Sequence, residues 1–73
     1  MPKLYSARQV LSALQKLGFV IVSQRGSHIK LRRTVKEVTY SPIVPNHKQI
    51  AQGTFQSILK QAGITKEVLE KKI

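Results

Sequence analysis

The pattern of apolar and polar positions near the start of the chain predicts an amphipathic helix. Val10, Leu14 and Leu17 recur at i, i+4 and i+7, so a helix would gather them on one stripe. Ser6 can cap the first turn, and Gln9 three residues later completes a capping box. A glycine directly after Leu17 supplies the left-handed residue on which many helices end. We therefore expect the first helix to run from Ser6 to Leu17.

Three segments after this helix have the composition or the alternation of β-strands. Phe19–Gln24 is rich in β-branched and aromatic side chains. His28–Arg33 alternates strictly between polar and apolar residues, which would turn Ile29 and Leu31 toward a core. The third segment, Glu37–Val44, contains and precedes prolines, as edge strands often do. Two short turns, Arg25–Ser27 and Thr34–Lys36, separate the segments, so we expect a three-stranded antiparallel meander.

Helical periodicity returns near the end of the chain. We expect Thr54 to cap a second helix, in which apolar residues recur at i, i+3, i+4 and i+7; they are Phe55, Ile58, Leu59 and Ala62. A glycine again marks the end, and a short helical tail follows. Two helices with apolar stripes must cover the apolar face of a sheet. We therefore expect a single small α+β domain of α-β-β-β-α order, with a three-stranded antiparallel sheet packed on two helices.

Charge narrows the choice of partners. The chain has 13 Lys and Arg residues against three acidic ones, for a formal net charge of +10. Such a field attracts polyanions, so nucleic acid is the first candidate partner and an acidic protein the second. No apolar run reaches the roughly 20 residues of a membrane span, and we expect no membrane partner. The absence of cysteine excludes disulfides and is consistent with a reducing cytoplasm.

The second strand segment indicates where chemistry could occur. If its apolar residues face the helices, His28, Lys30 and Arg32 line the open face at intervals of about 6–7 Å. Arg25 lies just across the turn. An imidazole among cations can hold a phosphate and also transfer a proton. The simpler alternative is that these residues are only the outward-facing polar positions of a solvated strand.

Ribonuclease chemistry would suit such a stripe. A neutral imidazole at His28 can accept the proton of a ribose 2′-hydroxyl, which then attacks its own phosphate. This reaction leaves a 2′,3′-cyclic phosphate and a 5′-hydroxyl end, and it spares DNA. His47 is a candidate general acid for the leaving oxygen; alternatively, it is a loop residue that hydrogen-bonds the backbone. The sequence lacks clusters of carboxylates or histidines, so we expect neither a metal nor another cofactor.

Several stretches together resemble the HicA family of toxin endoribonucleases. The first half contributes Leu17-Gly18-Phe19 and Gln24-Arg25-Gly26-Ser27-His28. The second half contributes Val44-Pro45-Asn46-His47, Gly53-Thr54-Phe55, Ile58-Leu59 and Ala62-Gly63-Ile64. The stretches follow the order of the family and cover nearly the whole chain, so a HicA-like domain is expected over residues 1–73.

This resemblance implies a fold like that of double-stranded-RNA-binding domains. It also implies that His28 is the catalytic histidine of an mRNA interferase, the toxin of a type II toxin–antitoxin system. The expected RNA contacts are Arg25, Gly26, Ser27, Lys30 and Arg32, of which Arg25, Lys30 and Arg32 come from the strand alternation alone. The implied partner is a HicB-type antitoxin that blocks the His28 face. The toxin–antitoxin complex would also bind operator DNA through the antitoxin.

Two other functions remain open at the level of sequence. A non-catalytic double-stranded-RNA-binding module would share the basic surface, because such modules recognise shape and 2′-hydroxyl groups. It would bind RNA and leave it intact. A structural adaptor for an acidic protein would instead bind its partner tightly and show no affinity for RNA even at low salt.

Overall fold

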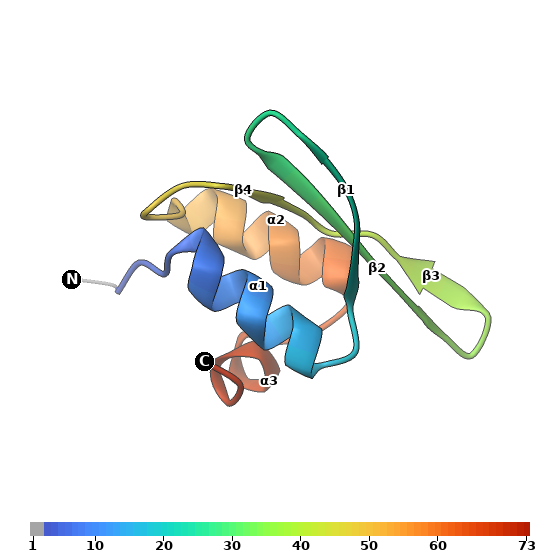
Figure 1. Ribbon diagram of the computed structural model, residues 1–73. Helices are drawn as coiled ribbons and strands as arrows, with labels where there is room; N and C mark the ends of the chain where they lie inside the picture. Colours follow the sequence, from blue (N-terminus) through green and yellow to red (C-terminus); the bar gives the residue numbers. More distant parts are fainter. Residues whose placement is uncertain (1–2) are drawn as a thin grey trace.

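The computed structural model describes residues 3–73 and has the expected order of helices and strands (Figure 1). Its elements are α1 (Ala7–Lys16), β1 (Val20–Arg25), β2 (His28–Val35), β3 (Val38–Tyr40), β4 (Ile43–Pro45), α2 (Gln52–Ala62) and α3 (Lys66–Glu70). The α+β class and the α-β-β-β-α order are confirmed, because β3 and β4 together take the place of the third predicted strand.

Helix α1 is built as its sequence predicts. The Ser6 hydroxyl accepts the Gln9 N–H at 3.2 Å, and the Gln9 side chain accepts the Ser6 N–H at 3.0 Å, which completes the capping box. Val10 and Leu14 are fully buried, and Leu17, which caps the carboxyl end, packs against the same core. The apolar stripe therefore fixes which side of α1 faces the sheet.

Strand β2 is the centre of the sheet. It pairs antiparallel with β1 along one edge and with β4 and then β3 along the other. The third predicted strand is divided at Pro42, which has no N–H to donate to a ladder. The Pro42 carbonyl still accepts the Leu31 N–H at 3.0 Å, so the two halves stay in line along β2.

The turn between β2 and β3 differs from the prediction. It consists of Lys36 and Glu37, whereas Thr34 and Val35 belong to β2. Both turn residues have positive φ, at 49° and 68°. Such a pair of left-handed residues matches a type I′ hairpin turn, for which Asn and Gly are the usual residues. Because Lys36 and Glu37 are not residues that favour positive φ, the sequence did not indicate a two-residue turn at these positions.

Helix α2 starts earlier than the sequence suggested. Its N-cap is Ala51, and the predicted cap Thr54 lies within the first turn. The predicted apolar stripe is confirmed, because Phe55, Ile58, Leu59 and Ala62 are all buried. Gly63 ends the helix in the left-handed conformation with φ of 67°.

The core lies between the two longer helices and one face of the sheet. Ile29, Leu31 and Val44 supply the sheet side, and the stripes of α1 and α2 supply the other. The buried residues of the described chain, 3–73, include no charged or polar side chain. None of the helices in this range is long and apolar enough to cross a membrane. The opposite face of the sheet carries His28 and Arg32, both exposed.

Tyr5 joins the segment before α1 to the two helices that end the chain. Its ring lies 5.5 Å from that of Phe55 in α2, and its hydroxyl donates to the Glu70 carboxylate of α3 at 2.5 Å. That hydrogen bond, together with desolvation and the charge of Glu70, raises the pKa of Tyr5 above its usual value of 10.0. The start and the end of the described chain are therefore fastened to the same side of the core.

Candidate active site

The site begins at the tight turn that joins β1 to β2. Gly26 takes a φ of 54° there, which lets two residues close the hairpin and set Arg25 opposite His28. The Ser27 carbonyl accepts the Asn46 N–H at 2.6 Å. The end of β1, the start of β2 and the end of β4 therefore meet at one corner of the sheet.

A β-bulge in β1 decides which side chains reach this corner. The register shifts between Ile21 and Ser23, so that Ser23 pairs with Lys30 and Arg25 with His28. Without the extra residue, every side chain of β1 beyond the bulge would turn to the opposite face of the sheet. The bulge therefore brings Arg25 to the face of His28.

We call the sheet face that carries His28 the site face. Directly paired residues of neighbouring strands lie side by side on one face, about 4.5–5.5 Å apart at their Cβ atoms. The site face holds two such cross-strand rows, Arg25–His28–Pro45 and Ser23–Lys30–Ile43. The predicted alternation of β2 is confirmed here, with His28 exposed and Lys30 half-buried beside it.

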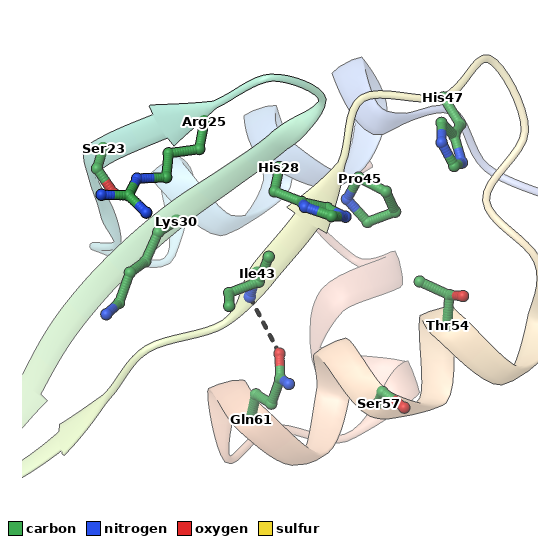
Figure 2. Close-up of a pocket in the computed structure, with 10 residues that line it drawn as sticks. All are labelled: Ser23, Arg25, His28, Lys30, Ile43, Pro45, His47, Thr54, Ser57 and Gln61. Carbon is green, nitrogen blue, oxygen red and sulfur yellow. Dashed lines mark hydrogen bonds between the residues drawn. The ribbon is translucent and has the colours of Figure 1, made fainter.

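Helix α2 supplies the facing side of the site. Thr54, Ser57 and Gln61 recur at i, i+3 and i+7 and so share one helical face, which we call the α2 wall. The Gln61 Oε1 atom accepts the Ile43 N–H at 3.0 Å, which fastens this wall to the outer edge of β4. Figure 2 shows the α2 wall below the two rows of the site face.

A cavity of about 650 Å³ lies between the site face and the α2 wall. Its lining consists of Ser23, Arg25, His28, Lys30, Ile43, Pro45, His47, Thr54, Ser57 and Gln61 (Figure 2). Arg25 and Lys30 are its charged residues, and none of the three acidic residues of the chain lines it. Its volume is within the range of roughly 300–1,000 Å³ that small-molecule sites occupy.

The structure brings four of the sequence-predicted site residues together and leaves three outside. His28, His47, Arg25 and Lys30 all line the cavity. Gly26, Ser27 and Arg32 do not: the first two form the hairpin turn, and Arg32 is exposed on β2 beyond the cavity. The arrangement nevertheless places the two histidines of the chain in one lining.

His47 is positioned through its backbone. Its carbonyl accepts the Ala7 N–H at 2.9 Å, and its N–H donates to the Pro45 carbonyl at 2.8 Å. The first contact fastens the loop to the start of α1, and the second folds it tightly after β4. The exposed His47 side chain lines the cavity beyond Pro45 (Figure 2).

Within residues 3–73 there is no cluster of three or more His, Cys, Asp or Glu side chains that could hold a metal ion. The lining instead offers imidazoles, cations, hydroxyls and one amide. Those groups suit an anion with hydrogen-bonding edges, which is the chemistry of a nucleotide.

A comparison with models of known protein families identifies the family of this chain. The model of the family described as HicA toxin of bacterial toxin-antitoxin matches residues 7–64. The chain belongs to the HicA toxin family. The match runs from the first residue of α1 to just beyond α2, and it contains every residue that lines the cavity. A search of curated proteins found no match.

Membership of the HicA family confirms the resemblance seen in the sequence, but several lining residues were not anticipated there. Thr54, Ser57 and Gln61 could have been found, because their spacing gives α2 a polar face beside its apolar stripe. Ser23 could not, because its place on the site face depends on a bulge that no local residue signals. Pro45 was noted only as the end of a strand.

Proposed function

We propose that this HicA-family toxin is a metal-independent endoribonuclease that cleaves mRNA and so inhibits translation. The observation that carries the proposal is the position of His28, in one cavity with Arg25, Lys30 and the second histidine, His47. A binding module has no need of two imidazoles in a basic cavity. A phosphoryl-transfer site does need a proton acceptor, a proton donor and cations.

In the proposed reaction His28 is the general base. Its neutral imidazole takes the proton from a ribose 2′-hydroxyl, and the O2′–phosphorus bond forms as the phosphorus–O5′ bond breaks. The products are a 2′,3′-cyclic phosphate and a 5′-hydroxyl. Arg25 is paired directly with His28, and Lys30 lies in the next row, so both cations are placed to stabilise charge on the phosphoryl oxygens.

His47 is the proposed general acid. Protonated, its imidazole would give a proton to the O5′ leaving oxygen, which balances the proton that His28 takes up. Two facts support this role: His47 lines the same cavity as His28, and its backbone is held by hydrogen bonds at both its N–H and its carbonyl. The exposed side chain itself has room to reach a bound substrate.

The bound RNA would extend beyond the cavity. Arg32 continues the β2 stripe past Lys30, and Gly26 and Ser27 present the backbone of the hairpin turn at the other end. Contacts of this kind with phosphates hold RNA in register without reading its sequence. The basic stripe from Arg25 to Arg32 is therefore the proposed path of the RNA backbone.

The proposed partner, besides mRNA, is a HicB-type antitoxin that covers the site face. Family membership places the chain in a toxin–antitoxin system. An antitoxin that covers His28 would compete with RNA for the same cations. Operator DNA would be bound by the toxin–antitoxin complex through the antitoxin, and both proteins would act in the cytoplasm, where mRNA is translated.

The proposed function is tested by incubating the purified protein in EDTA with messenger-length RNA and with DNA of the same sequence. We expect RNA fragments with 2′,3′-cyclic phosphate and 5′-hydroxyl ends, and intact DNA, because only RNA supplies the 2′-hydroxyl nucleophile. Cleavage of DNA, or of RNA only after a metal is added, would contradict the mechanism. Salt-sensitive binding that leaves RNA intact would identify a passive RNA-binding module instead.

A further inference from the structure

The two sides of the cavity differ in charge. The site face carries the cations Arg25 and Lys30, whereas the α2 wall carries two hydroxyls and one amide and no charge. A phosphate is bound best by cations. The edge of a nucleic-acid base is neutral and is read by directed hydrogen bonds from side chains such as amides and hydroxyls. The two sides therefore suit the two parts of a single nucleotide.

The Gln61 amide is oriented by the protein rather than by a ligand. Its Oε1 atom accepts the Ile43 N–H at 3.0 Å, so the Nε2 amino group remains as the donor on the cavity side. Figure 2 shows the amide pinned to β4 in this way. An amide held in this orientation presents its donor and not its acceptor, so it favours a base edge that accepts a hydrogen bond. Little side-chain entropy is then lost when the base binds.

The Ser57 hydroxyl also makes a hydrogen bond within the protein, but it uses its donor and keeps its acceptor free. Its hydroxyl donates to the Gly53 carbonyl within α2 at 3.2 Å, so its oxygen is left to accept a hydrogen bond. One helical turn thus offers a fixed donor at Gln61 and an acceptor at Ser57. Bases present donors and acceptors along one edge, and a wall with one of each can distinguish among them.

The part of the site face nearest to the α2 wall is apolar. Ile43 is 41% exposed although it belongs to a strand, and with Pro45 it separates Lys30 and His28 from the α2 wall (Figure 2). Unstacked bases rest on apolar side chains in many sites that act on single nucleotides. A base lying on Ile43 would present its edge to Gln61 and its ribose to His28.

We infer that the α2 wall reads one base beside the phosphate bound on the site face, and that Gln61 is the principal specificity-determining residue. This inference rests on the proposed function only in taking single-stranded RNA as the ligand. The base lies against the α2 wall, the phosphate lies on the site face, and the ribose lies between them. Cleavage then has a preference at one position of the sequence rather than none.

The test selects bound sequences from a random pool of 2′-fluoro RNA, which cannot be cut by 2′-hydroxyl attack whichever residue is the base. The proteins compared are the parent, Gln61→Leu, Gln61→Glu and the control Gln56→Leu. Gln56 is an exposed residue of α2 that does not line the cavity. Gln61→Glu keeps the acceptor for the Ile43 N–H and loses the donor, so it separates recognition from support of the fold.

We expect the parent and Gln56→Leu to enrich the same base at one position about tenfold, the discrimination that one well-placed polar contact provides. Gln61→Leu and Gln61→Glu should lose that enrichment or change the base. The added charge of glutamate also weakens binding to all sequences, so the enrichment of one base over the others is compared and not the overall affinity. Equal preferences in all four proteins, or no preference in the parent, would overturn the inference.

A separate cleavage reaction on ordinary RNA distinguishes failure of the proposed nuclease function from failure of the inference about Gln61. If the parent binds with a Gln61-dependent preference but cuts nothing, the proposed nuclease function fails and the inference stands. If it cuts RNA while the preference is independent of Gln61, the nuclease function stands and the inference fails.

Discussion

At the scale of single residues, a few backbone conformations decide what the side chains can do. Gly26 closes the hairpin that sets Arg25 opposite His28, and Gly63 ends α2 in the left-handed conformation. Gly63 has a second constraint, because a Cβ atom there would lie against the ring of Tyr40. The Tyr40 ring is half-buried and packs against the core, so it would have to shift to admit that atom.

Replacing this glycine should therefore be costly. We expect Gly63→Ala to destabilise the fold by about 2–5 kcal/mol, the sum of a left-handed alanine and of overpacking against Tyr40. Urea unfolding measures the loss. The matched control is Gly53→Ala, at a helical position with open space and no positive φ, where alanine should stabilise by about 0.5–1 kcal/mol. Equal effects at the two positions would contradict this account.

At the scale of elements, features that depend on spacing within one segment could be predicted from the sequence. Features that depend on how two strands pair could not. The stripe of α1 and the alternation around His28 follow from spacing alone, and both are confirmed. The bulge at Val22 depends on how β1 meets β2, and nothing near Val22 signals it. The division of the third strand was foreshadowed by Pro42, which cannot donate to a ladder.

The turn between β2 and β3 offers a test at this scale. Lys36 and Glu37 hold positive φ without the residues that tolerate it, which costs about 1–2 kcal/mol per residue. The double change Lys36→Asn and Glu37→Gly should raise the free energy of unfolding by about 1 kcal/mol, after the extra freedom of glycine in the unfolded chain is offset. Chemical denaturation measures it, and an unchanged or lower stability would show that the turn is not strained.

At the scale of the whole molecule, the fold separates the hydrophobic core from the proposed site. The apolar contacts lie on one face of the sheet under α1 and α2, and the cavity lies on the other face and around the edge of β4. Helix α2 takes part in both, since its apolar stripe builds the core and its polar face builds the α2 wall. Changes at the cavity should therefore alter activity with little effect on folding.

The central claim is that His28 removes the proton that starts cleavage. The most direct measurement compares the rates at which the parent, His28→Ala and the control Gln56→Ala cut one RNA in EDTA, with thermal unfolding to verify the fold. Gln56 is exposed on α2 and does not line the cavity. We predict that His28→Ala loses about 10²–10⁴-fold in rate while Gln56→Ala cuts like the parent. A folded His28→Ala protein that cuts at the parent's rate would contradict the claim.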